Sequence, residues 1–349
     1  MSVTLDDAGN DFSGISLNDN VGNFGVVSIT DSTAVSVVGD AFVLGVTAAD
    51  GVFLGGGDYT LLNVTAGGDV AATGTVTAAV ATITADTSSI NLDLSDTLND
   101  FGVVTLASAG GGSFASATIT DIDDLAVGGN ADSLTLDTGA ALSLSGGTYG
   151  ALSIASDGNV GQSGVVTVTG ATTITADNNP ITVDLSLAND FGSVMLADDG
   201  VGSVTSATVN DINDVTVGGD AGDLTVTSAG AVTLSGGVIA NTLDVTAETS
   251  VTQSSAVTAT NVNLTASNGP LTITLTEDND FDNIEMFTAG TGTYAGTTVS
   301  VTDTDDLYIA GNIDSLVVDA GGALVFAGAT YGGTVNVTAG GDVSQVGAL

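Results

Sequence analysis

The chain has 349 residues, of which 43% are apolar and 41 are acidic, and it contains no Lys, Arg or His. Nucleic-acid phosphates and anionic lipid headgroups are both held by Lys or Arg, so this composition excludes both kinds of partner. The chain also has no Cys for disulfide bonds or thiol chemistry. No apolar run of about 18 residues is present that would insert into a membrane as a helix.

The residue types predict an all-β protein. Most of the acidic residues are Asp rather than Glu, and Asp, like the 49 glycines, favours turns. Val, Ile and Thr are abundant and fit a pleated sheet. Short apolar/hydroxyl alternations, each followed by a turn signal, predict strands at 165–169, 172–175, 181–185, 192–196, 206–209, 215–217 and 224–226. No segment has the pattern of an amphipathic helix.

A tripeptide marks an internal repeat of about 90 residues. We expect its Asn and Asp to form a turn and its Phe to fill the interior once per repeat. The four copies are Asn10-Asp11-Phe12, Asn99-Asp100-Phe101, Asn189-Asp190-Phe191 and Asn279-Asp280-Phe281. The repeats then run over approximately 1–89, 90–180, 181–270 and 271–349, the last one incomplete.

Two all-β architectures fit this pattern. One is a string of four separate sandwich domains, and the other is a parallel β-solenoid with coils of roughly 20 residues, four or five per repeat. Only 4% of the residues are aromatic and no Pro-rich or Ser-rich linker interrupts the repeat, which favours the solenoid. We therefore expect one continuous β-solenoid over 1–349.

Acidic clusters recur at one phase of the repeat. Calcium binds carboxylate and carbonyl oxygens, which makes Ca²⁺ the candidate cofactor here, although solvated turns whose Asp side chains cap the local backbone explain the clusters better. The candidate ligands are Asp121, Asp123, Asp124, Asp211, Asp214, Asp303, Asp305 and Asp306.

Charge density and side-chain chemistry point to further expectations. A solenoid of this length would carry about one negative charge per 2 Å, close to duplex DNA, so we expect divalent cations to gather on it and to promote folding or bundling. The chain has no Arg, Lys or His to bind an acidic sugar or stabilise developing charge, no His to orient a serine and no Cys to act as a nucleophile. We expect no catalytic residue and no enzymatic activity.

Two surface features offer alternatives. Tyr59, Tyr149 and Tyr331 recur at the same position in three of the four repeats, with Ile239 in the other, and could stack on sugars, although packing in a turn explains them better. Thr-x-Thr pairs such as Thr82/Thr84 and Thr173/Thr175 would suit an ice-binding face. Thr is common throughout the chain, so a surface position on a strand explains these pairs better.

The segment 158–170, followed by 173–176 and by Ala188-Asn189-Asp190-Phe191, resembles the repeats of large bacterial exoproteins. These are the filamentous-haemagglutinin-like proteins and related β-strand-repeat surface proteins. The resemblance implies a right-handed parallel β-helix, secretion to the cell surface, and a role as an adhesin shaft, a fibre or a matrix component. The absence of basic residues departs from the usual composition of that family.

These observations together predict a structural, extracellular protein at the cell surface. We expect a subunit or shaft segment of a fibre or adhesin that associates with itself, end to end or laterally. The alternative is a calcium-dependent surface-layer or matrix protein. A glycan-binding adhesin module and an ice-binding protein are less favoured.

Overall fold

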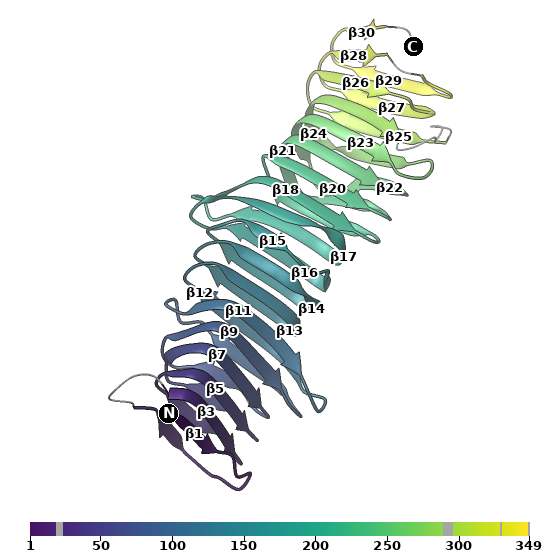
Figure 1. Cartoon of the computed structure of the whole chain (residues 1–349). Helices are drawn as coiled ribbons and strands as arrows, with labels where there is room; N and C mark the ends of the chain where they lie inside the picture. The colour runs from purple at the N-terminus through teal and green to yellow at the C-terminus, as the bar shows by residue number, and fades with distance from the viewer. Residues whose placement is uncertain (19–23, 289–295, 329, 348–349) are drawn as a thin grey trace. The chain divides into compact units, whose positions relative to one another are not determined.

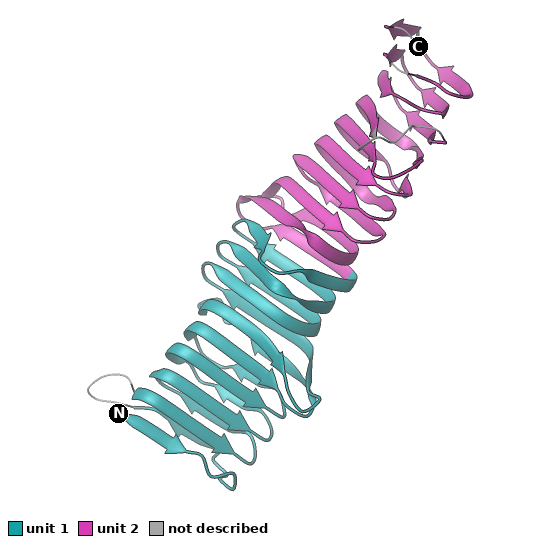
Figure 2. Ribbon diagram, turned by 45° about the vertical axis from the view of Figure 1, so that its right-hand side comes forward, with its two compact units in different colours: residues 1–170 teal, residues 171–349 magenta. Residues whose placement is uncertain are grey.

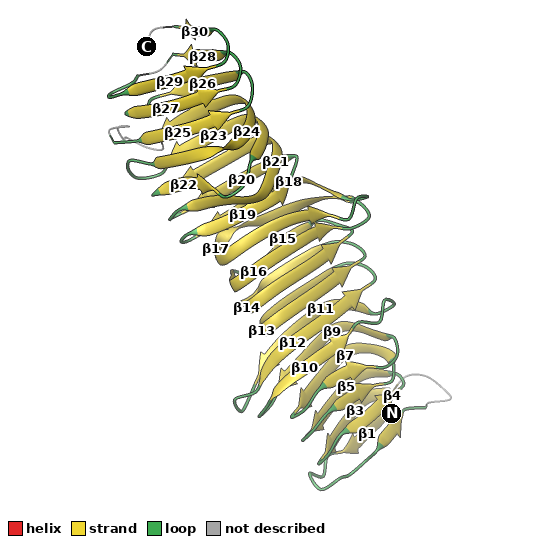
Figure 3. Ribbon diagram, turned by 180° about the vertical axis from the view of Figure 1, so that it is seen from behind, coloured by secondary structure: helices red, strands yellow, loops and turns green. Residues whose placement is uncertain are grey.

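The computed structural model describes residues 1–18, 24–288, 296–328 and 330–347. These residues form strands and turns and contain no helix, so none of them makes a helical membrane span (Figure 3). The chain divides into two compact units, Met1–Gly170 and Ala171–Leu349 (Figure 2).

Unit 1 holds the first fifteen strands and the first part of the sixteenth, because the boundary between the units at Gly170 lies within β16. They are β1 (Ser2–Leu5), β2 (Gly14–Ser16), β3 (Phe24–Asp31), β4 (Val35–Val38), β5 (Ala41–Ala48), β6 (Val52–Leu54), β7 (Gly57–Ala66), β8 (Val70–Ala72), β9 (Val76–Ala85), β10 (Ser89–Leu94), β11 (Asp100–Ser108), β12 (Ser113–Asp121), β13 (Leu125–Thr138), β14 (Leu142–Ser156), β15 (Val160–Gln162) and β16 (Val166–Ala176).

Unit 2 holds the remaining strands. They are β17 (Pro180–Asp198), β18 (Ser203–Asp211), β19 (Val215–Asp220), β20 (Asp223–Ser228), β21 (Val232–Ala247), β22 (Ser250–Gln253), β23 (Val257–Ala266), β24 (Thr272–Thr288), β25 (Thr298–Asp303), β26 (Leu307–Gly311), β27 (Ser315–Ala320), β28 (Leu324–Ala327), β29 (Val335–Ala339) and β30 (Val343–Val346).

The strands of unit 1 form two parallel ladders (Figure 1). The odd ladder joins β1, β3, β5, β7, β9 and β11 and continues into residues 126–129 of β13. The even ladder joins β2, β4, β6, β8, β10 and β12 and continues into residues 134–138 of β13. Each coil therefore contributes one stretch of strand to each ladder, because the chain passes from one to the other at every turn.

Unit 2 is built in the same way. Its first ladder runs from residues 180–185 of β17 through β18, β20, β21, β23, β24, β26 and β28 to β30. Its second ladder runs from residues 193–196 of β17 through β19, β21, β22, β24, β25 and β27 to β29. The longest strands, β17, β21 and β24, bend and belong to both ladders.

Each unit is therefore a parallel β-solenoid, as the sequence predicts, and the alternative of separate sandwich domains is wrong. Consecutive coils align inward-facing apolar residues: Val27 pairs with Leu44, Leu44 with Leu62, Leu62 with Ala81 and Ala81 with Val104. All five are buried, so each coil covers the apolar interior of the next. The expectation of one solenoid through 1–349 concerns the relation between the units and stays a prediction.

The 90-residue repeat contains a half-integral number of coils. The end of β3, Ser28-Ile29-Thr30-Asp31, matches the end of β12, Thr118-Ile119-Thr120-Asp121, yet β3 belongs to the odd ladder and β12 to the even ladder. Unit 2 repeats this relation, because β18 lies in its first ladder and the matching β25 lies in its second. Four and a half coils make up one repeat, so equivalent residues of successive repeats come from opposite walls of the solenoid.

The Phe of the repeated tripeptide lies in the interior. Phe101, Phe191 and Phe281 are fully buried, and Phe12, in the first coils, is half-buried. Val, Leu, Ile and Ala make up most of the remaining interior, although Phe24, Phe114, Phe326, Tyr59, Tyr149 and Met286 are also buried. A Phe side chain therefore fills a space that these smaller residues leave open, first from one wall and then, one repeat later, from the other.

Truncating one of these Phe residues should be costly. We expect Phe101→Ala to lower the free energy of unfolding by about 3–5 kcal/mol, because it removes a buried ring and leaves a cavity. Phe53→Ala is the matched control, since Phe53 is 40% exposed on β6, and should cost less than about 1 kcal/mol. Urea denaturation of both variants measures the difference, and equal losses would contradict the interior role of Phe101.

Candidate functional site

The repeated tripeptide lies at the turn where the chain passes between ladders, and its Asn side chain is buried there. Asn99, Asn189 and Asn279 have no exposed surface, and Asn10 is half-buried. A buried amide carries two donors and an acceptor that all need partners. Its hydrogen bonds therefore show what the turn is built to do.

Asn99 links three coils. Its Oδ1 accepts a hydrogen bond from the backbone N–H of Val76 (2.9 Å), one coil earlier, and its Nδ2 donates to the carbonyl of Leu94 (2.9 Å) in its own coil. Its backbone carbonyl accepts from the N–H of Ile122 (2.9 Å), one coil later. These contacts fix both the turn and its position against its two neighbours.

Asn279 makes the same set of bonds in unit 2. Its Oδ1 accepts from the N–H of Val257 (2.9 Å), and its Nδ2 donates to the carbonyls of Leu275 (3.1 Å) and Thr302 (2.9 Å). An amide pair with Gln253 adds to them: the Gln Nε2 lies 2.9 Å from Asn Oδ1, and the Asn Nδ2 lies 3.1 Å from Gln Oε1. Gln recurs two residues into the strand at Gln162 and Gln345.

A buried Asp one coil later completes the junction. In all four copies, the backbone N–H of the tripeptide Phe donates to Oδ2 of this Asp, at 2.5 to 2.7 Å. Its Oδ1 accepts a second backbone N–H from the residue two positions further on. The four carboxylates belong to Asp31, Asp121, Asp211 and Asp303, all of which are at most 3% exposed. We call each Asn, Phe and Asp set a junction.

Burial sets the protonation of these carboxyls. Desolvation raises the pKa of Asp121 and of Asp303 to about 6, and nearby Asp charges add to this effect, although the backbone N–H donors act to lower it. Burial likewise raises the pKa of Asp211. At Asp31 burial also acts upward, but hydrogen bonds from Phe12 and Thr33 outweigh it and lower the pKa.

In the coils that follow a junction, small hydroxyl side chains occupy the position that stacks on the buried Asp. Asp121 pairs in register with Thr138 and Thr138 with Ser156, and all three side chains are buried. The hydroxyls of Thr138 and Ser156 lie 3.0 Å apart, and both are within hydrogen-bond distance of the Ala140 carbonyl, at 3.2 and 3.0 Å. The Ser156 hydroxyl also lies 2.9 Å from the Gly158 carbonyl. Ser228 takes the position after Asp211, whereas Ala48 and Ala320 follow Asp31 and Asp303.

The predicted calcium ligands therefore divide into three groups. The first Asp of each cluster points inward and is held by the backbone. The last one reaches the next coil: Asp124, Asp214 and Asp306 accept the N–H of Ala141, Ala231 and Ala323 at 2.9, 2.7 and 2.6 Å. Asp123 and Asp305 are exposed. Within 1–18, 24–288, 296–328 and 330–347, no three acidic side chains are grouped to hold a metal ion. Calcium binding at these residues stays a prediction.

The Asp of the tripeptide itself faces outward. Asp11, Asp100 and Asp280 are exposed and Asp190 is half-buried. Asp190 Oδ1 accepts from Nδ2 of Asn213 at 2.9 Å, and Asp11 Oδ1 accepts from the hydroxyl of Thr33 at 3.0 Å. These side chains brace the outside of the turn that the Asn and the buried Asp hold from within.

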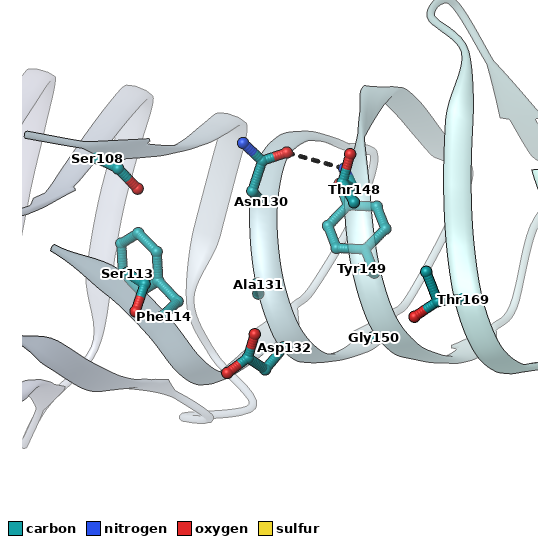
Figure 4. Close-up of a pocket in the computed structure, with 10 residues that line it drawn as sticks. All are labelled: Ser108, Ser113, Phe114, Asn130, Ala131, Asp132, Thr148, Tyr149, Gly150 and Thr169. Atoms are coloured by element: carbon teal, nitrogen blue, oxygen red, sulfur yellow. Dashed lines mark hydrogen bonds between the residues drawn. The ribbon is translucent and has the colours of Figure 1, made fainter. Parts of the chain in front are cut away.

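A shallow hollow of about 380 Å³ lies over Tyr149 in unit 1 (Figure 4). Its rim is polar and includes Asn130, whose Oδ1 accepts from the N–H of Thr148 at 2.9 Å, and Asp132. The Tyr149 ring beneath is fully buried, and Tyr59 is 4% exposed. Neither ring offers a face for stacking on a sugar, and both pack in the solenoid wall.

The junctions are suited to holding coils together rather than to chemistry. Each buried carboxylate is enclosed by backbone donors from two coils, so neither oxygen is free to meet a substrate. Sequence reasoning identifies the tripeptide and the acidic clusters but misses that the two are joined across a coil. It also misses Asp31, because the first repeat reads Asp31-Ser32-Thr33 and shows no acidic cluster.

Comparison with known proteins gives one match. A family described as "Repeats of unknown function (DUF5649)" matches residues 128–198, 221–288 and 310–349, which together make up just over half of the chain. The first two segments each contain one complete tripeptide. No curated protein and no solved structure matches the chain.

Removing the Asn side chain should weaken the junction. We expect Asn99→Ala to lower the free energy of unfolding by about 1–3 kcal/mol, because the Val76 N–H and the Leu94 carbonyl would stay buried without partners. Asn91→Ala on β10 is the control, since Asn91 is exposed, and should cost less than about 0.5 kcal/mol. Denaturant midpoints distinguish the two. If Asn91→Ala lowered stability as much as Asn99→Ala, the role of Asn99 in holding the junction together would be refuted.

The buried carboxyls should make stability fall as pH rises. Between an unfolded pKa of about 4 and the folded pKa of about 6, the folded chain binds protons that the unfolded chain has released. Their contribution is therefore complete below about pH 4 and is lost as pH rises through about 6, at roughly 2–3 kcal/mol per carboxyl.

Thermal melting at about pH 4.5 and 7.5 measures this loss. The double variant Asp121→Asn/Asp303→Asn should flatten the step. Asp123→Asn/Asp305→Asn removes two exposed charges that only add to the effect of burial, so it should keep most of the step. The same step in both double variants would assign the pH dependence to general charge repulsion and not to the junctions.

Proposed function

Because the chain belongs to the DUF5649 family, which is described only as repeats of unknown function, we propose its role from the geometry: it is a structural, extracellular protein, a subunit or shaft segment of a cell-surface fibre or adhesin. It associates with itself rather than with nucleic acid or membrane. Its task is mechanical, since each repeat adds length and each junction fixes coils to one another.

The junctions carry this proposal. What recurs in every repeat is a set of hydrogen bonds between coils, half-buried in the first repeat and buried in the later ones. It involves the Asp one coil later and Asn10, Asn99, Asn189 and Asn279. A binding or catalytic protein repeats an accessible site, whereas a shaft repeats the parts that hold it together. Parallel backbone ladders on two walls of each unit supply stiffness along the stack.

The composition supports a place outside the cell. A chain without Lys or Arg offers trypsin-like proteases no cleavage site, folded or unfolded. Its 41 acidic residues, with no cation to offset them, keep neighbouring molecules apart in dilute solution and attract divalent ions. Both properties suit a protein that meets proteases and dissolved divalent cations outside the cell.

Immunogold electron microscopy of intact source cells tests the proposal. We expect label on fibres or on the outer surface before permeabilisation, and loss of that label after proteinase K but not after trypsin. A cytosolic protein with the same antibody is the control for cell integrity. Label that requires permeabilisation would refute the extracellular role.

A further inference from the structure

Three columns of outward residues on the odd ladder of unit 1, together called the odd face, carry no charge. The columns take three of the outward positions on each of β3, β5, β7, β9 and β11, whereas Asp58 and Asp100 pair in the same ladder beyond them, at the beginning of β7 and β11. The apolar column is Val26, Val43, Leu61, Val80 and Val103; the middle column is Ser28, Gly45, Asn63, Thr82 and Thr105; the third is Thr30, Thr47, Thr65, Thr84 and Ala107. All fifteen residues are exposed or half-buried.

Acidic residues frame this face without entering it. Asp40, Asp58 and Asp100 lie where the strands begin, and Asp50 and Asp86 lie in the turns where they end; all but half-buried Asp86 are exposed. The apolar column lies between these two edges, with Val26 47% and Val80 39% exposed. An uncharged centre with a charged rim is the arrangement of a protein interface.

The fold itself does not require this composition. The matching columns of unit 2 begin at β18, two repeats further along the chain. There the positions of the apolar column hold Ser206, Asp223, Thr242, Asn261 and Asn283. The next column contains Asp244 and Glu285. A solenoid wall with polar and acidic outward residues therefore forms the same kind of ladder, so the ladder itself does not require the apolar column of unit 1.

We propose that the odd face of unit 1 binds the odd face of a second copy of this chain in an isologous pair. Charge identifies the occupant. A chain with 41 acids and no base repels its own copies wherever acidic residues would meet. The odd face allows two copies to come into contact without burying an unpaired carboxylate, and it places one apolar column against another.

The size of the face predicts how strong the pair is. Five strands about 4.8 Å apart, with outward positions about 6.7 Å apart along each, present roughly 500 Å² per copy, or about 1,000 Å² in the pair. This lies at the lower limit for a specific interface, so the pair is weak and reversible. The acidic rims repel each other, and salt screens that repulsion. Dimerisation therefore increases with ionic strength.

Sedimentation equilibrium of the full chain over a range of protein concentrations, in about 0.02 to 1 M NaCl, tests the proposal. We expect a monomer–dimer equilibrium that shifts toward dimer as salt rises. Leu61→Asp/Val80→Asp should raise the dissociation constant at least ~100-fold, because it buries unpaired charges in the pair. Thr242→Asp/Asn261→Asp adds the same two charges at the matching positions of unit 2 and should leave the constant unchanged.

A cysteine readout decides the question even if the double Asp variant fails to fold. The natural chain has no Cys, so Leu61→Cys has one thiol and should form a disulfide-linked dimer on mild oxidation faster than Asn261→Cys. Three outcomes would overturn the proposal: a wild-type monomer at all salt concentrations, equal weakening by both Asp pairs, or equal cross-linking of both Cys variants. Adsorption of monomers to ice or a neutral polysaccharide through this face would also overturn it. None of these results depends on where the protein is located.

Discussion

The backbone of every coil must meet the backbone of the next in register, and the turns are where this is hardest to achieve. A turn exposes N–H and C=O groups that the neighbouring coil does not pair automatically, and the interior offers no water to satisfy them. Asn99 and Asp121 supply the missing partners: one joins three coils through its amide and its backbone carbonyl, and the other accepts two N–H groups from adjacent coils. The ladders, the apolar interior and the outward columns all follow once these turns are aligned.

Because the chain has no basic side chains, the buried carboxylates of the junctions are held by backbone N–H groups alone or with a neighbouring hydroxyl. A buried carboxylate is usually compensated by Arg or Lys, but here backbone N–H groups are its donors. Hydrogen bonds only partly offset the cost of burial, which is why the pKa of Asp121 and of Asp303 lies near 6. Asp suits this position better than Glu because its short side chain reaches the local backbone directly from the end of a strand. About half of the remaining acids that the structure describes lie outside the strands, and none of them is among the fifteen residues of the odd face.

Because a repeat contains a half-integral number of coils, the junctions and the interior recur in every repeat while the outward residues are free to differ. Matching segments such as β3 and β12 come from opposite walls, so the junctions recur on alternate sides while the interior receives the same residue types from both. Outward positions are under no such constraint. Leu61 and Thr242 occupy matching places in the two units, and only the first belongs to an apolar column. Surface chemistry can therefore differ from repeat to repeat within one scaffold.

The sequence by itself determined the all-β class, the solenoid, the period of about 90 residues and the interior place of Phe101, because alternation and composition directly report which residues avoid water. Only the tertiary structure decided that a repeat spans four and a half coils, since that ratio depends on how turns of different length bring strands into register. It also decided that Asp121 turns inward while Asp123 stays in water, and that Val26, Val43 and Leu61 form one column. Residues far apart in the chain share a wall only after the coils stack, so no local pattern could have placed them together.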